Sequence, residues 1–592
     1  MTFRRVAGAL LLLSFGASSR SALPPPAPVA FVDVTVLPMD QDRRLEHQTV
    51  VVENGLITTM GPVGTTPIPR GARRVGAGGK FLIPGLADMH VHVDDTTDFL
   101  LYLAKGVTTV RNLEGEPYHL QWRDQINRGE LIGPTIFTSG PFTNLPRIRT
   151  PDDARRAVIE QKAAGYDEIK IHGGLEAETY DTLAAVAHRL GIRLVGHAPR
   201  NLPFDNLLRN HQDEISHAEE VLYTYFHSDV SDSSVAKIPL VARALKDRDI
   251  WMTATFVTYD RIYRQVANLD SLLADPATAY VTPYQLALWQ RENNRYIRNW
   301  GPNGIPTLRS RRDFLVRLIR GLHQAGVPIM TGTDAIGPLW IPGWSLHEEL
   351  RDFVAMGFTP YEALSAATRL PAQFLGQAQV FGTIAPDRRA DLVLLDRDPM
   401  ADIRNTESIN GVMVRGRWFP RADLDTKLNR LAQANRAEER LVQSILDRGI
   451  VVAAHRRCMS SQPPLVVDAQ RLLDLRLTTA FAQVVRDSGV AVAEGFANTV
   501  RSQCPEAVLF SEPKINAVGA AFRAQHRLND AVQVLGFNAR LFPESFLSHY
   551  WLAEAQLEKG DTAQAVLSYQ RSVELDPGMQ EAIARLKELG RN

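Results

Sequence analysis

The stretch FLIPGLADMHVH, residues 81–92, decides the fold assignment. It joins a short apolar strand to a second strand that ends in two histidines, His90 and His92. Residues two positions apart in a strand project from the same face, so both imidazoles point to one side. Many sheets contain such a pair, and alone it is weak evidence for a metal site. The segments that follow decide whether it belongs to one.

Seven further short apolar segments follow this strand, and amphipathic helical segments alternate with them up to about residue 375. They are GVTTVRNL (106–113), PTIFTSG (134–140), EIKIHG (168–173), IRLVGHA (192–198), DEISHAE (213–219), IWMTATFV (250–257) and VPIMTGTDA (327–335). Strands that alternate with helices form parallel sheets, and eight such units close into a (β/α)₈ barrel. We therefore predict an α/β fold with a TIM-like barrel over residues 86–378.

Both flanks of this barrel have the pattern of strands. Residues 31–85 alternate apolar and polar side chains, and Asn54-Gly55 between two apolar runs is a strong hairpin signal. Residues 379–422 return to the same pattern in ADLVLLDRDP and INGVMVRGRWF. The sequence therefore predicts one small β-sandwich domain, with its first part at 31–85 and its second part at 379–422.

The C-terminal segment, residues 423–592, is predicted to be a helical domain with an internal repeat. Ala531, Val532 and Pro543 recur 34 positions later as Ala565, Val566 and Pro577. A 34-residue helix-turn-helix period closed by proline is typical of tetratricopeptide repeats. Such repeats present a groove for another chain. We expect this domain to bind a protein partner, to pair copies of this chain or to cap the predicted barrel.

The first residues have the pattern of a secretory signal peptide. Arg4 and Arg5 precede an apolar run from Val6 to Phe15, and small residues follow. This three-part pattern predicts a signal peptide over 1–21, and a Pro-rich spacer over 22–30 follows it. We therefore expect a secreted protein, or a periplasmic one in a Gram-negative cell, with no membrane span.

The composition weighs against a nucleic-acid-binding function. Among 592 residues, Lys+Arg and Asp+Glu number 66 each, so no global field attracts nucleic acid or an anionic membrane. A chain of this length forms two or three independently packed units. The spacing of the two cysteines, Cys458 and Cys504, neither supports nor excludes a disulfide.

Side chains that can bind a metal lie at the ends of several predicted strands. They are His90, His92, Lys170, His197, His217 and Asp334. Barrel enzymes place their chemistry at the carboxyl ends of the strands, so we expect these side chains to converge. Imidazole and carboxylate suit zinc or a similar divalent ion. A protonated lysine would repel two cations, so Lys170 belongs there only if it is neutralised or converted to an anionic adduct.

At this point the motifs resemble a known family. PGLADMHVH, the inward lysine, the two later histidines and TGTDA resemble the binuclear branch of the amidohydrolase superfamily. Over about residues 30–422, VVVENGLITTMGP, SLHEELRDFVAMGFTPYEALSAAT and ADLVLLDRDP are similar to its imidazolonepropionase-like and prolidase-like members. The resemblance implies two divalent metal ions, zinc by expectation, bridged by a carbamate that carbon dioxide forms on Lys170. It places His90, His92 and Asp334 on one metal and His197 and His217 on the other.

The resemblance also implies the reaction. A hydroxide that bridges the two ions attacks the substrate, and Asp334 accepts its proton and passes it to the leaving group. The expected substrate has a C–N bond in a peptide-like compound, an N-acyl amino acid or a cyclic amide. Two alternatives stay open: ester, lactone or phosphotriester hydrolysis by the same site, and a non-catalytic exported scaffold that acts through its repeats.

One departure from the family pattern concerns the substrate pocket. Imidazolonepropionase-like members often carry Gly-Gly-His after the third strand, whereas FTSGPFTNLPRIRT, residues 137–150, has no histidine. This difference weighs against imidazolone chemistry. Arg111, Tyr223 and Tyr225 lie at or just beyond predicted strand ends. They are candidates to bind a substrate carboxylate or the developing oxyanion, and packing at the rim is the alternative.

Overall fold

The computed structural model describes residues 26–590, apart from 94, 145–146, 283–284, 287–288, 292–293, 449–480, 482–483, 486–488, 504–511, 525 and 577–578. The predicted signal peptide, the start of the Pro-rich spacer and both cysteines lie outside the described residues. A search of the described helices finds none with the length and apolar character needed to cross a membrane.

Eight short parallel strands form a central ring. In chain order they are β6 (Leu86–Val91), β7 (Val107–Asn112), β8 (Thr135–Thr138), β9 (Glu168–Ile171), β10 (Arg193–Gly196), β11 (Glu214–Ser216), β12 (Trp251–Thr253) and β13 (Ile329–Met330). They pair in three groups, β6–β8, β9–β10 and β11–β13. Parallel bridges and a backbone hydrogen bond join the groups, at Ser139–Glu168, Leu194–Asp213 and Val91–Ala335. The carboxyl ends of all eight strands therefore open on one face.

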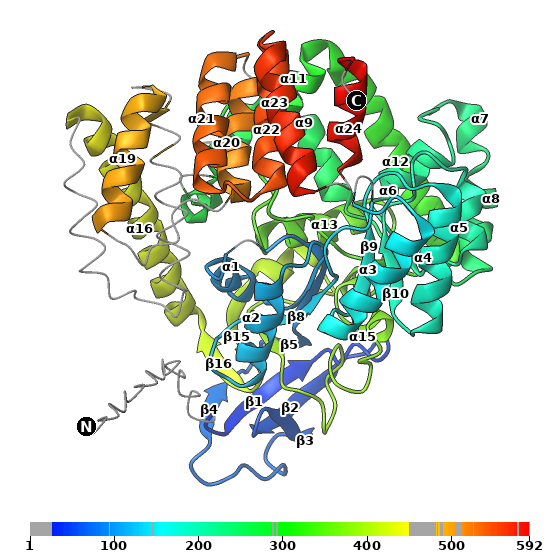
Figure 1. Cartoon of the computed structure of the whole chain (residues 1–592). Coiled ribbons are helices and arrows are strands. Elements are labelled where there is room, and N and C mark those ends of the chain that lie inside the picture. The colour runs from blue at the N-terminus through cyan, green and yellow to red at the C-terminus, as the bar shows by residue number, and fades with distance from the viewer. Residues whose placement is uncertain are drawn as a thin grey trace, which may run out of the picture.

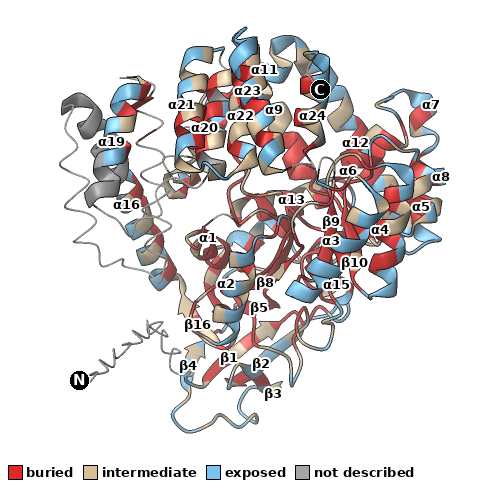
Figure 2. Ribbon diagram, in the orientation of Figure 1, coloured by how far each residue is buried: buried red, intermediate tan, exposed pale blue. Residues whose placement is uncertain are grey.

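Helices surround the ring, whose strands are almost entirely buried (Figure 2). The helices before β12 are α1 (Asp98–Ala104), α2 (Pro117–Asn127), α3 (Pro151–Ala164), α4 (Ala177–Arg189), α5 (Phe204–Arg209), α6 (Ala218–Thr224), α7 (Asp232–Val235) and α8 (Ile238–Lys246). The long β12–β13 connection holds α9 (Phe256–Leu273), η1 (Pro276–Tyr280), α11 (Arg295–Trp300), η2 (Pro302–Gly304) and α12 (Ile305–Ala325). After β13 come α13 (Trp344–Ala355), α14 (Pro360–Ala366) and α15 (Arg369–Phe374).

Local sequence signals explain where these helices begin and end. In α3, for example, the Thr150 side chain accepts a hydrogen bond from the Asp153 amide and Pro151 occupies the first turn. The helix ends at Gly165, whose φ of 91° is the left-handed conformation that glycine adopts without steric cost.

Strands from the two flanks pair into one sheet. The strands are β1 (Val29–Val36), β2 (Leu45–Glu53), β3 (Leu56–Pro62), β4 (Arg73–Gly76), β5 (Phe81–Pro84), β14 (Leu392–Leu395), β15 (Ile409–Val414) and β16 (Arg417–Pro420). The order is β16-β15-β14-β5-β1-β2-β3, with β4 beside β1. Asn54 and Gly55 form the hairpin turn between β2 and β3, with φ of 52° and 82°.

The predicted sandwich of two sheets needs correction. β14 pairs antiparallel with β5 along four residues. The flanks therefore meet edge to edge, and hydrogen bonds join all eight described strands into a single sheet. This sheet has its own hydrophobic core, which includes Phe31, Val50 and Leu394. Alternation along each strand predicts a buried face, but it does not state which strand edge is free to pair.

The C-terminal part is helical. It begins with α16 (Arg421–Arg448) and continues with α19 (Val490–Gln503), α20 (Glu512–Ala524), α21 (Leu528–Leu541), α22 (Phe546–Glu558), α23 (Thr562–Leu575) and α24 (Gln580–Glu588). From α20 onward each helix packs against the next. Ala531 and Ala565, which share a position in the predicted repeat, are both fully buried.

Several contacts attach this helical part to the connections between the ring strands. The Asn435 side chain on α16 donates hydrogen bonds to the carbonyls of Ala279 and Val281 at 3.1 and 3.0 Å. Arg149, in the β8–α3 connection, forms an ion pair with Glu581 of α24 at 3.8 Å. Because that connection leaves the carboxyl end of β8, helix α24 borders the face on which the strands end, while the β1–β5 sheet lies at the other end of the molecule (Figure 1).

Candidate metal centre

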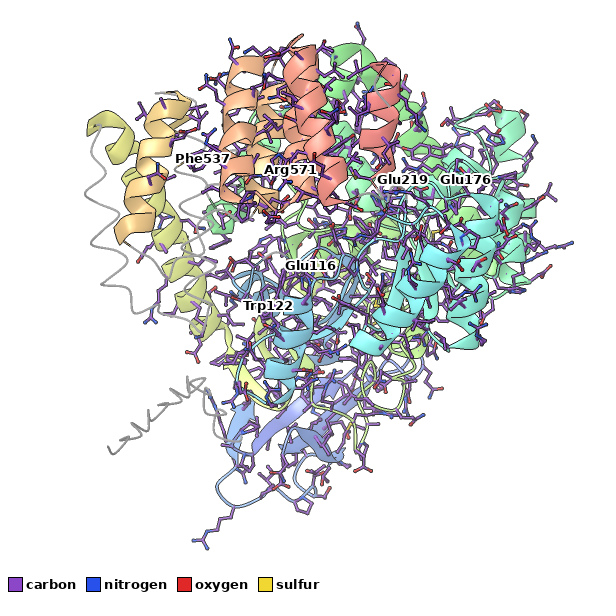
Figure 3. The ribbon with its side chains drawn as sticks, viewed as in Figure 1. Glu116, Trp122, Glu176, Glu219, Phe537 and Arg571 are labelled. Carbon is purple, nitrogen blue, oxygen red and sulfur yellow. The ribbon has the colours of Figure 1, made fainter. Side chains whose placement is uncertain are left out.

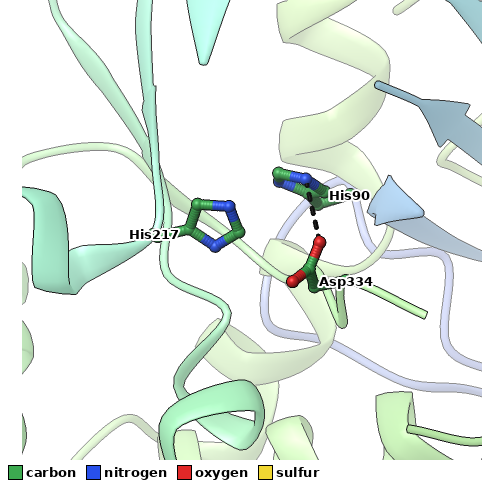
Figure 4. A group of neighbouring side chains, drawn as sticks. All are labelled: His90, His217 and Asp334. Carbon is green, nitrogen blue, oxygen red and sulfur yellow. Dashed lines mark ion pairs between the residues drawn. The ribbon is translucent and has the colours of Figure 1, made fainter. Parts of the chain in front are cut away.

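The side chains predicted to bind metal gather at the carboxyl ends of the ring strands. Ligand atoms of His90, His217 and Asp334 all lie within 4.8 Å of one another (Figure 4). Oδ1 of Asp334 lies 3.3 Å from Nε2 of His90 and 3.0 Å from Nε2 of His92. One carboxylate oxygen that follows the last strand therefore contacts both histidines of the first strand.

Lys170 faces the ring axis and reaches the same point. Its Nζ atom lies 3.3 Å from Nε2 of His90, and its side chain is fully buried. Ile169 and Ile171, on either side of it, pack in the hydrophobic cluster of α3 and α4. Burial lowers the pKa of Lys170 to about 8, because a desolvated ammonium is less stable than the neutral amine. Near neutral pH, a larger fraction of Lys170 is therefore the neutral amine than for an ordinary exposed lysine.

His197 and His217 complete the group, and each has one nitrogen already engaged. Nδ1 of His217 lies 2.8 Å from Oγ1 of Thr255, and Nδ1 of His197 lies 3.1 Å from Oε1 of Glu220. The two rings lie 4.8 Å apart between centroids. With Nδ1 held in this way, Nε2 of each imidazole is the nitrogen available to a metal.

The electrostatics favour the metal-binding protonation states. Burial, together with the charge of Lys170, lowers the pKa of His90, His197 and His217 well below the usual value for histidine. Burial alone would raise the pKa of Asp334, but the hydrogen bond with His92 and nearby positive charges outweigh it and keep the carboxyl ionised. Neutral imidazole and ionised carboxylate are the forms that bind cations.

One buried atom tests whether a metal fits. Within the described part of the chain, Nδ1 of His90 has no hydrogen-bond partner although it is buried. Buried polar atoms are nearly always paired, so an atom of this kind among several ligands fits a site built for a cation. The donor set of imidazoles and one carboxylate suits zinc.

The most compact trio does not follow the predicted division between two ions. His90 and His217 were assigned to different metals, yet their ring centroids lie 4.4 Å apart. They face each other because β6 and β11 lie across the ring. Which ion each histidine binds stays a prediction.

Backbone conformations at the site are unusual. His217 and Asp334 have φ of 71° and 56°, and such conformations persist only where the surroundings impose them, often at functional sites. Gly196, next to His197, has φ of 109°, and a Cβ atom there would lie 2.4 Å from the Ile171 carbonyl oxygen and 2.6 Å from Cδ of Lys170. Only glycine allows β10 to approach the lysine so closely.

Several buried carboxylates around the site had not been singled out from the sequence. Asp88 accepts hydrogen bonds from the amide and hydroxyl of Thr333, at 3.0 and 2.6 Å, and burial raises its pKa to about 7. Glu168 is fully buried on β9, where burial likewise raises its pKa to about 7. Asp88 precedes His90 by two positions, and Glu168 precedes Lys170 by two positions. Because residues two apart on a strand share a face, this spacing could have identified both carboxylates.

The expectation that Arg111 binds a substrate carboxylate needs correction. Its side chain is fully buried inside the ring, with a terminal nitrogen 3.1 Å from Glu214 and Nε 3.7 Å from Glu168. Nε also donates a hydrogen bond to the Met89 carbonyl at 2.7 Å. Arg111 lies on the inward face of β7 and not beyond its end, and two carboxylates already balance its charge.

The two tyrosines lie in the helical layer after β11. Tyr223 packs beneath the guanidinium of Arg200, 4.9 Å from its ring centroid. Tyr225 packs edge-on against Phe204 at 5.4 Å and lines, with Arg200 and His227, a cavity of about 470 Å³. A role of Tyr223 and Tyr225 in substrate binding stays a prediction.

Comparison with known proteins identifies the family. A model described as the amidohydrolase family matches residues 81–419. The chain is 25% identical over 394 residues to 5-methylthioadenosine/S-adenosylhomocysteine deaminase of Symbiobacterium thermophilum, which covers 62% of this chain and 84% of the relative. It is 24% identical over 393 residues to imidazolonepropionase of Geobacillus kaustophilus, covering 60% and 84%.

A solved structure agrees with this comparison. A protein from Bifidobacterium longum described as a candidate prolidase superimposes with a TM-score of 0.53 and 26% identity, over 69% of this chain and 100% of the other. The family model covers more than half of the sequence, and the chain belongs to the amidohydrolase family. It is an enzyme, a hydrolase that acts on carbon–nitrogen bonds. The C-terminal helices lie outside the matched range.

Proposed function

We propose that this protein is an exported two-metal amidohydrolase that hydrolyses a C–N bond in a peptide-like substrate, an N-acyl amino acid or a cyclic amide. The convergence of His90, Lys170, His217 and Asp334 at the end of a (β/α)₈ barrel carries the proposal. The similarity to a candidate prolidase supports a peptide-like substrate.

Two divalent ions, zinc by the chemistry of the donors, would be held by His90, His92 and Asp334 and by His197 and His217. When bound, the ions would supply Lewis acidity and lower the pKa of water. Lys170 would bridge them as a carbamate: its neutral amine attacks carbon dioxide, a C–N bond forms and one proton is released. The buried position and lowered pKa of Lys170 support this step.

The protein's own residues would manage the proton and the geometry. The ionised carboxylate of Asp334 would accept the proton of the attacking water and deliver it to the leaving nitrogen. Glu220 and Thr255 would hold His197 and His217 in a single tautomer and ring orientation, since each occupies the Nδ1 atom.

The experiment is a metal and substrate survey on protein purified without chelator. We expect about two divalent ions per chain and hydrolysis that stops on chelation and returns with zinc. The substrates are dipeptides, N-acyl amino acids and cyclic amides, tested beside esters, lactones and phosphotriesters. One ion or none would overturn the two-metal site, and a higher kcat/KM for the oxygen and phosphorus esters would favour the alternative hydrolase activity.

We further propose that residues 1–21 direct export and that the C-terminal helices are tetratricopeptide-like repeats that bind a protein partner or a second copy of this chain. The 34-residue recurrence and the sequential packing of α20 to α24 support the repeats. Cell fractionation of the full chain and of a chain without residues 1–21 tests export. Sedimentation of the purified chain at several concentrations tests self-association.

A further inference from the structure

A cavity of about 400 Å³ is lined by both the flanking sheet and the connection from α2 to β8. Helix α2 runs from Glu116 past Trp122 toward the sheet (Figure 3), and its last turn forms one wall of the cavity. The hairpin turns that follow β2 and β15 form another wall. Arg415, in the second of these turns, donates a hydrogen bond to Thr135, the first residue of β8. The cavity therefore lies at the amino ends of the ring strands, whereas the metal centre lies at their carboxyl ends.

Arginines dominate the polar lining of this cavity. Among the described residues that line it, four are arginines and none is acidic. The arginines are Arg128, Arg389, Arg415 and Arg417. The charge of the first is already balanced, because Arg128 forms an ion pair with Glu130 at 2.7 Å. Apolar side chains, which include Leu56, Ile126 and Leu131, form part of the remaining wall.

Among the described residues, the guanidinium of Arg415 has neutral hydrogen-bond partners only. Its Nη2 atom donates to Oδ1 of Asn127 at 2.9 Å and to Oγ1 of Thr135 at 3.0 Å. Its Nε atom is buried and has no hydrogen-bond partner in that part of the chain. Burial and the charge of Arg389 lower the pKa of Arg415. The positive charge of Arg415 is therefore incompletely balanced, and such a charge costs free energy in a buried position.

Arg389 has one carboxylate partner and one unpaired donor. Its Nε atom donates to Oδ2 of Asp391, and Oδ1 of the same carboxylate accepts a hydrogen bond from the Arg415 amide at 2.8 Å. Nη2 of Arg389 is buried and, within the described part of the chain, has no hydrogen-bond partner. One carboxylate is therefore shared by two arginines, and two buried N–H donors on the residues that line the cavity have no acceptor.

These features suit a small organic anion. Carboxylate and phosphate oxygens accept hydrogen bonds from the planar fork of arginine, and such charge-assisted bonds are stronger than neutral ones. The apolar part of the wall would pack against the carbon skeleton of the same ligand. The volume of the cavity lies within the usual range of small-molecule sites, which is about 300–1,000 Å³.

We propose that this cavity binds a small organic anion, a carboxylate or phosphate group on an apolar carbon skeleton, through Arg389 and Arg415. The site lies at the opposite ends of the ring strands from the metal centre, so its occupant is a second ligand and not the substrate. The proposal goes beyond the proposed function and does not depend on it.

Calorimetry with phenyl phosphate, benzoate and the neutral benzamide tests the site on the full chain. We expect phenyl phosphate or benzoate to bind, and the one that binds more tightly shows whether phosphate or carboxylate is preferred. Benzamide should bind at least about 10-fold more weakly, because it offers no charged acceptor. Arg415→Gln should weaken binding of the anion by roughly 10- to 100-fold for the same reason.

Leu56→Glu tests the site without removing a hydrogen bond of the fold. Leu56 is 42% exposed and lies opposite Arg389 in an antiparallel bridge, so a carboxylate there competes with the ligand for the guanidinium. We expect anion affinity to fall about 10-fold or more. Leu240→Glu, at an exposed leucine of α8, is the matched control and should bind as the parent does.

Three results would overturn the proposal. They are the absence of binding of both anions at millimolar concentration, equal affinity for benzamide, and equal anion affinity in the parent and Leu56→Glu. The last result also identifies an anion that binds at the metal centre instead, because Leu56 is remote from it. If circular dichroism shows that Arg415→Gln does not fold, Leu56→Glu decides alone.

Discussion

Nζ of Lys170 lies 3.3 Å from Nε2 of His90, although the two residues are 80 positions apart in the chain and come from β9 and β6. The contact brings a side chain that normally carries a positive charge into a group of imidazoles that could hold a metal. Such a neighbour is compatible with cations only as a neutral amine or an anion. The first prediction follows from this contact.

Replacing Lys170 with alanine is expected to remove at least one of the two proposed ions and to lower activity by roughly 100-fold or more, because the bridging anion is lost. Lys170→Arg should behave similarly, since a guanidinium stays charged. Metal analysis and kcat/KM on zinc-loaded protein measure both effects, with the exposed Lys237→Ala as control. Unchanged metal content in Lys170→Ala would contradict the prediction.

Gly196→Ala is expected to displace Lys170. The added Cβ would lie 2.4 Å from the Ile171 oxygen and 2.6 Å from Cδ of Lys170, at a φ of 109°. We expect lower metal content and a Tm reduced by several degrees, as for roughly 1–3 kcal/mol of strain. Gly191→Ala is the matched control, because its φ of 61° is also positive but no atom lies within 4 Å of the new Cβ. Equal metal loss in both variants would show that backbone strain, and not contact with Lys170, is the cause.

Glu220→Gln is expected to weaken metal binding without removing any ligand. Glu220 holds Nδ1 of His197 at 3.1 Å and is itself held by Nε of Arg200 at 3.0 Å. Changing such a partner of a metal-binding histidine typically reduces metal affinity by about 10- to 100-fold. Zinc titration against a competing chelator measures the affinity. An affinity equal to that of the parent would show that Glu220 does not position His197.

Asp352 makes stability depend on pH. Burial, together with the charges of Asp260 and Glu348, raises its pKa to about 7 in the folded protein, against an ordinary value of 3.8. The folded state therefore binds more protons than the unfolded state between these values, and stability from this group is lost as the pH rises toward 7.

Asp352→Asn should remove that loss. At pH 8 we expect the free energy of unfolding of the variant to exceed that of the parent by about 1 kcal/mol or more, since one pKa unit corresponds to about 1.4 kcal/mol. The variant should therefore unfold at a higher temperature. The difference should shrink at pH 5. Thermal unfolding at the two pH values measures it, with the exposed Asp313→Asn as control. A difference that is the same at both pH values would contradict the role of ionisation.

Part of the candidate metal centre was predictable because each candidate ligand carries a local signal. His90 and His92 alternate along one strand, and Lys170 stands between two isoleucines that pack outward. The rule that barrel strands end on one face then predicts that these side chains meet. The Asn54-Gly55 hairpin was predictable for the same reason, since its conformation depends on two adjacent residues.

Other features of the site and the fold could not be predicted, because they depend on contacts between residues distant in the chain. Arg111 has the position of a rim residue in the sequence, yet Glu168 and Glu214 from two other strands bind it inside the ring. The pairing of β5 with β14, which makes one sheet of the two flanks, likewise joins segments about 300 positions apart.

The sequence by itself determined the alternation of strands and helices, the candidate ligands at the strand ends and the family, because these depend on patterns within a few residues. Only the tertiary structure decided which partners each buried carboxylate has. Glu219 and Glu220 are adjacent and chemically identical, but Glu220 forms ion pairs with both Arg200 and His197, whereas Oε2 of Glu219 has no hydrogen-bond partner among the described residues. The charge state of a buried group depends on the atoms that surround it in space, and the tertiary fold determines which atoms these are.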